Sequence, residues 1–301
     1  DDGFRRNDQD VHYETLQSDQ LKAIIDTAFP RVKEYELDGK TLTGQVQKLD
    51  KMSINGVLVT PEVQYRKIDD TTAEYVMTVR NDDEFINAEI TVKLQLVGNE
   101  MHFDVTKVVN KNNVEMGKPV DNVRKLIQTI EFPGNTLVSV GSNKQNAKFD
   151  GAQMSTNTHR AGDYHLDLKT GKMNDYAYGF MYGFVSSNEL AASVWSNSQF
   201  TYQGNDFARI TTALQRVDGV NYIGIQSSPY WYQRAYKNLV FPEYTLELPS
   251  SKVVITKDLN KDNVVDWQDG AIAYRNIMNN PKGAESVPDL VAYRIAMNFA
   301  S

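Results

Sequence analysis

The chain contains no cysteine among its 301 residues. Disulfides, zinc–thiolate sites and thiol nucleophiles are therefore excluded. A globular chain of this length buries roughly three quarters of its unfolded surface, so its core needs no covalent cross-links. The missing cysteine does not distinguish a cytoplasmic protein from one that a bacterium exports.

The sequence also lacks a block of basic residues and a long apolar run, which bears on nucleic acids and membranes as partners. The 32 basic and 39 acidic residues give a net charge of −7, and no basic block interrupts the mixture. We therefore expect no nucleic-acid binding. No apolar run approaches the roughly 18 residues of a membrane-spanning helix, so we expect no span. The chain opens with Asp1 and Asp2 and shows no signal-peptide pattern, which suggests a piece processed or excised from a longer protein.

Common catalytic motifs are also missing, because the sequence has no Gly-x-Ser-x-Gly elbow, phosphate-binding loop or His-Glu-x-x-His. His159 and His165 fall in a polar, glycine-dotted stretch over 141–176, which we expect to be a long loop. Beside their charged neighbours they would hold a sugar or serve in acid–base chemistry. The alternative is that both are ordinary surface residues.

The segment from Asp258 to Asp269 has the most informative pattern, with oxygen side chains at positions one, three, five, nine and twelve. A calcium ion takes six to eight oxygen ligands, and alternate residues of a short loop can supply them. We predict a structural calcium site, and its ligands are Asp258, Asn260, Asp262, the Val264 carbonyl, Asp266 and Asp269. Position six is Asn263, which tolerates the left-handed conformation of such a loop. An acidic turn without metal is the alternative.

Most of the chain before residue 250 alternates apolar and polar residues, which predicts antiparallel strands with one buried face. The clearest hairpin joins 86–96 to 101–105 through Gly98 and Asn99, and a second spans 208–226. Ser18 predicts the N-cap of a short helix over 19–28. The expected fold class is mainly β, a large antiparallel sandwich.

Helical spacing begins only after the acidic loop. Trp267, Ala271, Tyr274 and Met278 predict one face of a helix, and a second helix is expected over 286–298. These two helices form the short helical segment of the expected fold.

Aromatic side chains offer a second candidate ligand site. Tyr230, Trp231 and Tyr232 are consecutive, and flat rings stack against the faces of sugars. Together with His159 and His165 they are the candidate carbohydrate-binding residues. Aromatic residues on strands are equally often part of the core, so this alternative stays open.

Three segments resemble the endo-α-N-acetylgalactosaminidases of glycoside hydrolase family 101. They run from Thr27 to Val32, from Asp266 to Arg275 and from Val291 to Phe299. The resemblance implies that residues 1–250 form a galactose-mutarotase-like super-sandwich. Residues 251–301 would be the calcium loop and two helices that lead toward a (β/α)8 catalytic barrel.

The resemblance also implies a function. Such enzymes release the Gal-β1,3-GalNAc disaccharide from mucin-type O-glycoproteins, and their catalytic carboxylates lie in the barrel, so we carry none over to this chain. We expect a non-catalytic segment of a secreted or bacterial cell-surface glycosidase, with the downstream barrel and mucin-type O-glycans as its partners. The alternatives are a stand-alone carbohydrate-binding module and an aldose-epimerase-like enzyme.

Overall fold

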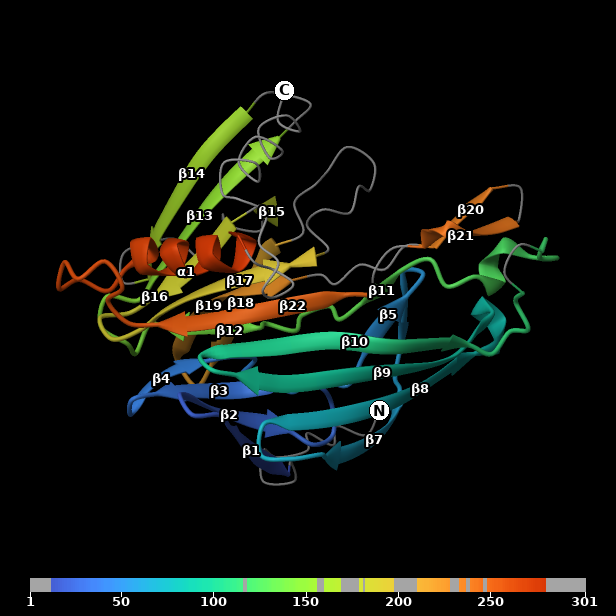
Figure 1. Ribbon diagram of the computed structural model, residues 1–301, viewed down its shortest axis with the longest axis horizontal. Helices are drawn as coiled ribbons and strands as arrows, with labels where there is room; N and C mark the ends of the chain where they lie inside the picture. Colours follow the sequence, from blue (N-terminus) through green and yellow to red (C-terminus); the bar gives the residue numbers. More distant parts are fainter. Residues whose placement is uncertain are drawn as a thin grey trace.

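The computed structural model describes residues 12–115, 118–155, 160–168, 179–180, 182–197, 210–227, 233–236, 239–245 and 248–279. Two large antiparallel sheets face each other around one hydrophobic core, and a single described α-helix lies on the outer side of one of them (Figure 1). The expected fold class, a mainly β antiparallel sandwich, is confirmed.

The first sheet has eight strands in the order β1-β2-β3-β4-β12-β19-β18-β15. Their bounds are β1 (Tyr13–Gln17), β2 (Leu21–Asp26), β3 (Val32–Leu37), β4 (Lys40–Thr43), β12 (Val138–Gly141), β19 (Val220–Ser227), β18 (Ile210–Val217) and β15 (Gly179–Phe180).

The second sheet has nine strands in the order β14-β13-β16-β17-β22-β10-β9-β8-β7. Their bounds are β14 (Arg160–Asp167), β13 (Lys148–Ser155), β16 (Tyr182–Ser186), β17 (Ala191–Ser196), β22 (Ser250–Thr256), β10 (Glu100–Asn110), β9 (Ile86–Val97), β8 (Thr72–Asn81) and β7 (Glu62–Lys67).

Smaller elements complete the described part of the chain. They are β11 (Ile130–Glu131), β5 (Met52–Ile54), β6 (Val57–Val59), β20 (Gln233–Tyr236), β21 (Leu239–Thr245), the 3-10 turns η2 (Asp82–Glu84) and η3 (Val123–Lys125), and the helix α1 (Trp267–Asn279).

Both predicted hairpins are confirmed. Strands β9 and β10 pair around Gly98, which has a φ of +58°, and the alternate apolar residues of both strands are buried. Strands β18 and β19 pair around Asp218 and Gly219, whose φ angles are +50° and +77°. Two consecutive residues with positive φ give the turn whose twist suits antiparallel strands.

The predicted helix over 19–28 is wrong, because strand β2 occupies this segment and pairs with both β1 and β3. Leu21, Ala23 and Ile25 are buried in the alternating pattern of a strand. The Ser18 hydroxyl oxygen does accept a hydrogen bond from the Leu21 N–H at 3.0 Å, but it closes a turn between strands instead of opening a helix.

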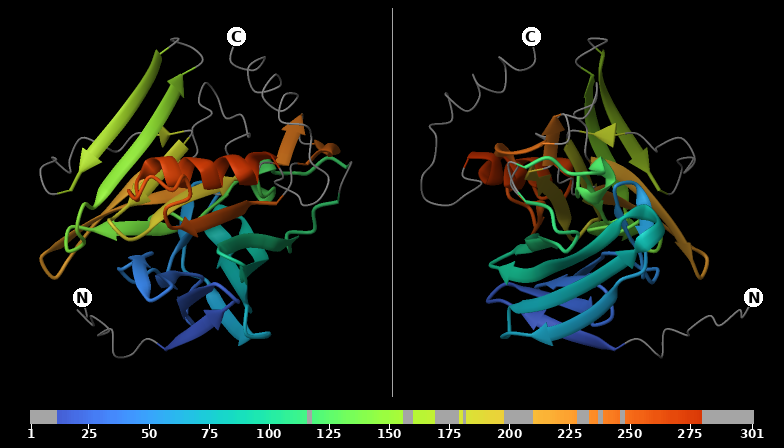
Figure 2. Two further views of the ribbon diagram at one scale, coloured as in Figure 1. Left: turned by 60° about the vertical axis from the view of Figure 1, so that its left-hand side comes forward. Right: turned by 90° about the vertical axis from the view of Figure 1, so that its right-hand side faces the viewer.

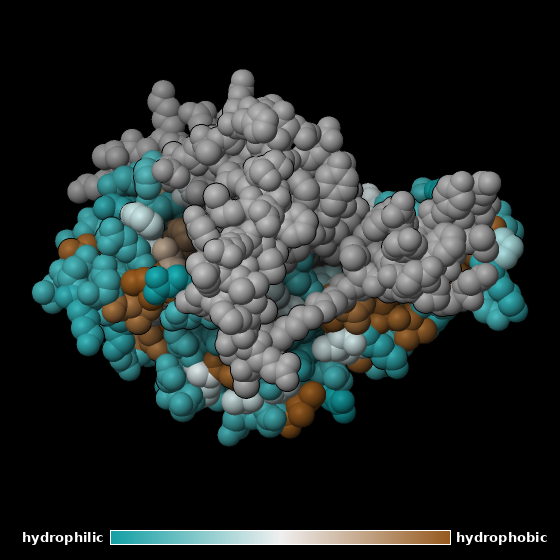
Figure 3. Space-filling model, turned by 45° about the horizontal axis from the view of Figure 1, so that its top comes forward, coloured by the Kyte–Doolittle hydropathy of each residue, from teal (hydrophilic) through white to brown (hydrophobic). Residues whose placement is uncertain are grey.

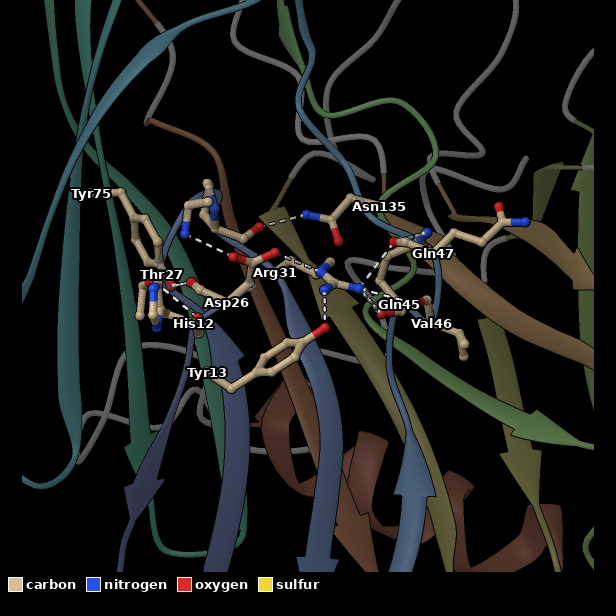
Figure 4. Close-up of polar contacts among 12 residues, drawn as sticks. His12, Tyr13, Asp26, Thr27, Arg31, Gln45, Val46, Gln47, Tyr75 and Asn135 are labelled. Atoms are coloured by element: carbon tan, nitrogen blue, oxygen red, sulfur yellow. Dashed lines mark hydrogen bonds and ion pairs between the residues drawn. The ribbon is translucent and has the colours of Figure 1, made fainter. Parts of the chain in front are cut away.

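A buried ion pair fastens the first sheet to the segment that follows it (Figure 4). Arg31 is fully buried and pairs with Asp26, with 3.1 Å between Nε and Oδ2. Its other guanidinium nitrogens donate to the Tyr13 hydroxyl and to the carbonyls of Gln45, Val46 and Gln47 at 2.8–3.1 Å. One side chain therefore bonds the Asp26 carboxylate and three consecutive carbonyls of the segment that follows β4.

Helix α1 belongs to the sandwich. It packs against β16, β17 and β22 on the outer face of the nine-stranded sheet (Figure 2). Its buried residues Ala273, Tyr274 and Ile277 form a satellite core with Phe184, Trp195 and Val254. Strand β22 lies between β17 and β10, so the sheet continues beyond the predicted domain boundary at residue 250.

The predicted apolar face of this helix is correct in part. Tyr274 is buried, but Trp267 is 39% exposed. The helix comes close to the sheet at Gly270, where a Cβ would lie 3.0 Å from the Phe184 ring, and Trp267 lies one turn before this approach. The second predicted helix, over 286–298, lies outside the described residues. No helix in the described part of the chain is long and apolar enough to cross a membrane.

Candidate functional site

The acidic loop between β22 and α1 folds through a series of side-chain to backbone hydrogen bonds. Asp258 accepts from the N–H groups of Asp262 and Asn263 at 3.2 and 2.8 Å. Asp262 accepts from the Val264 N–H at 2.9 Å. Asn263 has a φ of +65°, which confirms the left-handed conformation predicted at position six. The predicted ligand residues therefore direct the turns of the loop themselves.

The end of the loop caps α1. The Asp266 carboxylate accepts from the Gln268 N–H at 2.9 Å, and the Asp269 carboxylate accepts from the Asp266 N–H at 3.0 Å. Asp266 therefore caps the start of α1, and Asp269, three residues on, bonds back to the N-cap N–H as the second residue of a capping box does. Asp269 is completely buried, and it also accepts from the N–H groups of Leu259 and Asn260 at 2.7 and 3.3 Å. Its carboxylate thus joins both ends of the loop to the first turn of α1.

The donor set of this loop suits a hard cation in its chemistry. All six predicted ligands offer oxygen, and a carboxylate oxygen that accepts one N–H bond still has a lone pair for a metal. Within the described residues, however, no three His, Asp or Glu side chains form a cluster that could hold a metal ion by themselves. A calcium ion here would therefore also need the Asn260 amide oxygen, the Val264 carbonyl and water.

His165 lies on strand β14, which corrects its expected place in a loop. It is the direct cross-strand partner of Asp150 on β13, and its Nδ1 contacts the Asp150 Oδ1. The imidazole is largely exposed, whereas the carboxyl is almost buried. Burial raises the pKa of Asp150, His165 opposes this effect, and the charge of Asp266 adds to it.

A second imidazole–carboxylate pair lies on β10. The His102 Nε2 is 3.4 Å from the Glu100 Oε1, and the hydrogen bond with His102 lowers the pKa of Glu100. Residues two apart on a strand share a face, so the sequence spacing could have indicated this pair. Asp150 had no such signal, because its partner is 15 residues away across a hairpin.

The other predicted carbohydrate-binding residues fall on parts of the chain that the structure does not describe. Tyr230, Trp231, Tyr232 and His159 lie outside the described residues. A shallow depression of about 260 Å³ on strands β1–β3 is lined mostly by polar side chains. Tyr35, its aromatic residue, is fully buried and donates to the Leu137 carbonyl, so it offers no ring face for a sugar.

Comparison with known proteins matches two parts of the chain to two different families. Residues 16–267 match the family described as galactose mutarotase-like fold domain, and residues 268–301 match the family described as endo-alpha-N-acetylgalactosaminidase. A curated relative from Renibacterium salmoninarum, provisionally named endo-alpha-N-acetylgalactosaminidase, is 27% identical over 299 residues. The match covers 95% of this chain and only 19% of that relative.

Two solved structures are similar to this chain at low sequence identity. The alpha-N-acetylgalactosaminidase NagBb from Bifidobacterium bifidum is 7% identical with a TM-score of 0.50, and the match covers 89% of this chain and 39% of that one. A galactose mutarotase related enzyme from Lactobacillus acidophilus is 13% identical with a TM-score of 0.42, and the match covers 85% of this chain and all of that one. The chain therefore belongs to the galactose mutarotase-like fold domain family and carries, from residue 268 on, a stretch of the endo-α-N-acetylgalactosaminidase family.

Proposed function

We propose that this chain is the non-catalytic β-sandwich of a secreted or cell-surface glycosidase that releases Gal-β1,3-GalNAc from mucin-type O-glycoproteins. Its role is to support the catalytic barrel of the same polypeptide. The observation that carries the proposal is the place where the two family matches meet. They join at Trp267 and Gln268, in the first turn of α1, and α1 packs on the sandwich.

A retaining glycosidase needs two carboxyl groups about 5–5.5 Å apart on either side of the glycosidic bond. In the proposed arrangement the barrel supplies both of them. We therefore expect no hydrolysis of a nitrophenyl glycoside of the disaccharide by the 301-residue chain. Clear turnover that survives repeated purification would contradict the assignment of a non-catalytic role.

One observation favours a second candidate, an aldose-epimerase-like activity. The His165 imidazole and the Asp150 carboxyl are in contact on the face of the sheet opposite the core residues Phe149 and Leu166, and such a pair can exchange a proton. Polarimetry on freshly dissolved α-galactose tests it, with the His165→Ala variant as the matched control. A rate of mutarotation that rises with the parent chain and not with the variant would establish this activity.

Direct contact with carbohydrate is the third possibility, and it depends on Tyr230, Trp231, Tyr232 and His159 together with His165. Calorimetry with the Gal-β1,3-GalNAc disaccharide measures it. Heat of binding that disappears in Trp231→Ala would place sugar recognition in this chain. No heat at millimolar ligand would leave support of the barrel as the role.

We further propose that the acidic loop holds a structural calcium ion through Asp258, Asn260, Asp262, the Val264 carbonyl, Asp266 and Asp269. The two positive charges of the ion would offset half of the charge of the four carboxylates that the loop gathers within twelve residues. A ligand that binds only the folded state stabilises it, by about 2.7 kcal/mol at a hundredfold excess over Kd. We expect the melting temperature to rise with calcium and to fall again with chelator.

The matched variants for this test are Asp258→Ala and Asp82→Ala. The first removes a predicted ligand and should abolish the response to calcium. The second removes a carboxylate of η2, which lies outside the loop, and should leave the response intact. Identical melting curves for the parent chain in calcium and in chelator would show that the loop is an acidic turn without metal.

A further inference from the structure

Three large apolar side chains are exposed in the acidic loop and the first residue of α1. Leu259, Val264 and Trp267 are 42%, 52% and 39% exposed, and they fall within nine consecutive residues. We call these three residues the loop patch. Figure 3 shows hydrophobic residues lying among hydrophilic ones on the described part of this face of the molecule. Three exposed apolar side chains on one short segment indicate an interaction surface more strongly than a single one does.

The loop patch is held on a fixed frame. The Asp269 carboxylate accepts from the N–H groups of both Leu259 and Asp266, so the two arms of the loop meet at the start of α1. Asp262 fixes the backbone at Val264 through a hydrogen bond of 2.9 Å. A surface whose backbone is fixed before binding loses little conformational entropy when a partner covers it.

We propose that the loop patch is the surface on which the glycosidase domain of the same polypeptide docks. This inference rests on the proposed function. Trp267 is the last residue of the galactose mutarotase-like match, and Gln268 is the first residue of the glycosidase match. The chain spans 19% of the length of the Renibacterium salmoninarum relative, so that relative carries a large amount of sequence that could cover the patch.

The covalent linkage favours this occupant over a second copy of the chain or a separate partner. A domain joined covalently to α1 needs no long-range attraction, because the linkage supplies a high effective concentration.

The fluorescence of Trp267 can show whether the glycosidase domain covers the loop patch. The probe is acrylamide quenching, measured on the 301-residue chain and on a polypeptide that continues past Ser301 into the glycosidase domain. The difference between each protein and its Trp267→Phe variant isolates this residue from Trp195 and Trp231. We expect the quenching constant of Trp267 to fall severalfold in the longer polypeptide. An equal constant in both proteins would overturn the proposal.

A pair of double variants supplies the second test. Leu259→Ser with Trp267→Ser removes the loop patch, and Leu58→Ser with Leu214→Ser removes apolar side chains of similar exposure elsewhere. Neither should change the melting temperature of the 301-residue chain by more than about 2 °C, since surface substitutions cost little. Only the first should lower the melting temperature of the longer polypeptide, and equal melting of the two variants there would contradict the docking role.

The proposal and the proposed function fail in different ways. If the longer polypeptide hydrolyses the nitrophenyl disaccharide while Trp267 stays exposed, the docking surface is wrong and the function stands. If Trp267 becomes buried in a polypeptide without that activity, the function is wrong and the docking surface stands. A dimer of the 301-residue chain that the patch variant dissociates, seen by light scattering, would assign the surface to self-association instead.

Discussion

At the scale of single residues, the buried interactions of Arg31 join residues that the sequence alone does not bring together. An arginine is ordinarily expected at the surface, yet Arg31 is fully buried because Asp26, Tyr13 and three backbone carbonyls satisfy all of its bonding groups. Those partners are up to 18 residues away. Arg31 lies in the segment from Thr27 to Val32 that carries the family resemblance, but only the fold shows what it bonds.

Replacing this arginine therefore has a predictable cost. Arg31→Met removes the charge partner of the buried Asp26 carboxylate, and breaking a buried pair in this way costs about 3–5 kcal/mol. Urea unfolding followed by circular dichroism measures it. The matched control is Arg66→Met, because Arg66 is 71% exposed and its pair with Glu74 is worth at most about 1 kcal/mol. Similar losses for both variants would show that the buried network is not special.

The carboxyl of Asp150 gives a prediction with a definite pH dependence. Burial raises its pKa above the ordinary 3.8, so the folded state binds this proton more tightly than the unfolded state does. Its contribution to stability is therefore full below pH 3.8 and is lost as the pH rises through the folded-state pKa. Asp150→Asn keeps a neutral side chain of the same shape at every pH.

We expect Asp150→Asn to raise the melting temperature relative to the parent chain at pH 7, and to lose this advantage as the pH falls toward 4. The comparison should be repeated with Asp82→Asn, whose carboxylate is exposed and paired with Arg80 on the surface. A gain for Asp150→Asn that stays the same from pH 7 to pH 4 would mean that titration of this carboxyl is not its cause.

At the scale of elements, the sequence pattern predicted correctly those elements whose formation depends on residues close together in the chain. Hairpins such as β9–β10 and β18–β19 were predictable because alternation and turn residues agree within a dozen positions. The error over 19–28 arose because a serine followed by a short apolar segment suits a helix cap and a turn between strands equally well. The pairing of β2 with β1 and β3 stabilises the strand over a helix. This pairing cannot be read from the residues of the segment itself.

The loop before α1 has two roles, capping of the helix and the proposed binding of calcium. These two roles can be tested separately. Asp266→Ala removes the oxygen that accepts the Gln268 N–H, and loss of such a cap costs about 1 kcal/mol. We expect this loss in the presence of chelator, because capping does not need a metal. Asp266→Asn retains a good cap and should restore stability in chelator. Chemical denaturation in chelator makes the measurement, and an unaffected Asp266→Ala variant would refute the capping role.

At the scale of the whole molecule, the sequence predicts a mainly β sandwich but not its strand order. Strand β22 lies between β17 and β10, and its partners are roughly 60 and 150 residues away in the chain. No local pattern encodes such pairing, which explains why a boundary at residue 250 could be drawn through the edge of a central strand. The resemblance predicted the family correctly because it depends on matched sequence and not on local periodicity.

One consequence of this arrangement is that α1 and the sandwich should unfold together. Tyr274 and Ile277 are almost completely buried against Phe184, Trp195 and Val254. Replacing both with alanine should lower the free energy of unfolding by about 5 kcal/mol or more, and the loss should shift one shared transition seen by both far- and near-ultraviolet circular dichroism. Arg275→Ala lies on the exposed face of the same helix and should change it by less than about 0.5 kcal/mol. If the double variant instead shows a small early transition and an unchanged main one, α1 would be an independent appendage, and its packing on the sheet could not align the sandwich with the domain that follows.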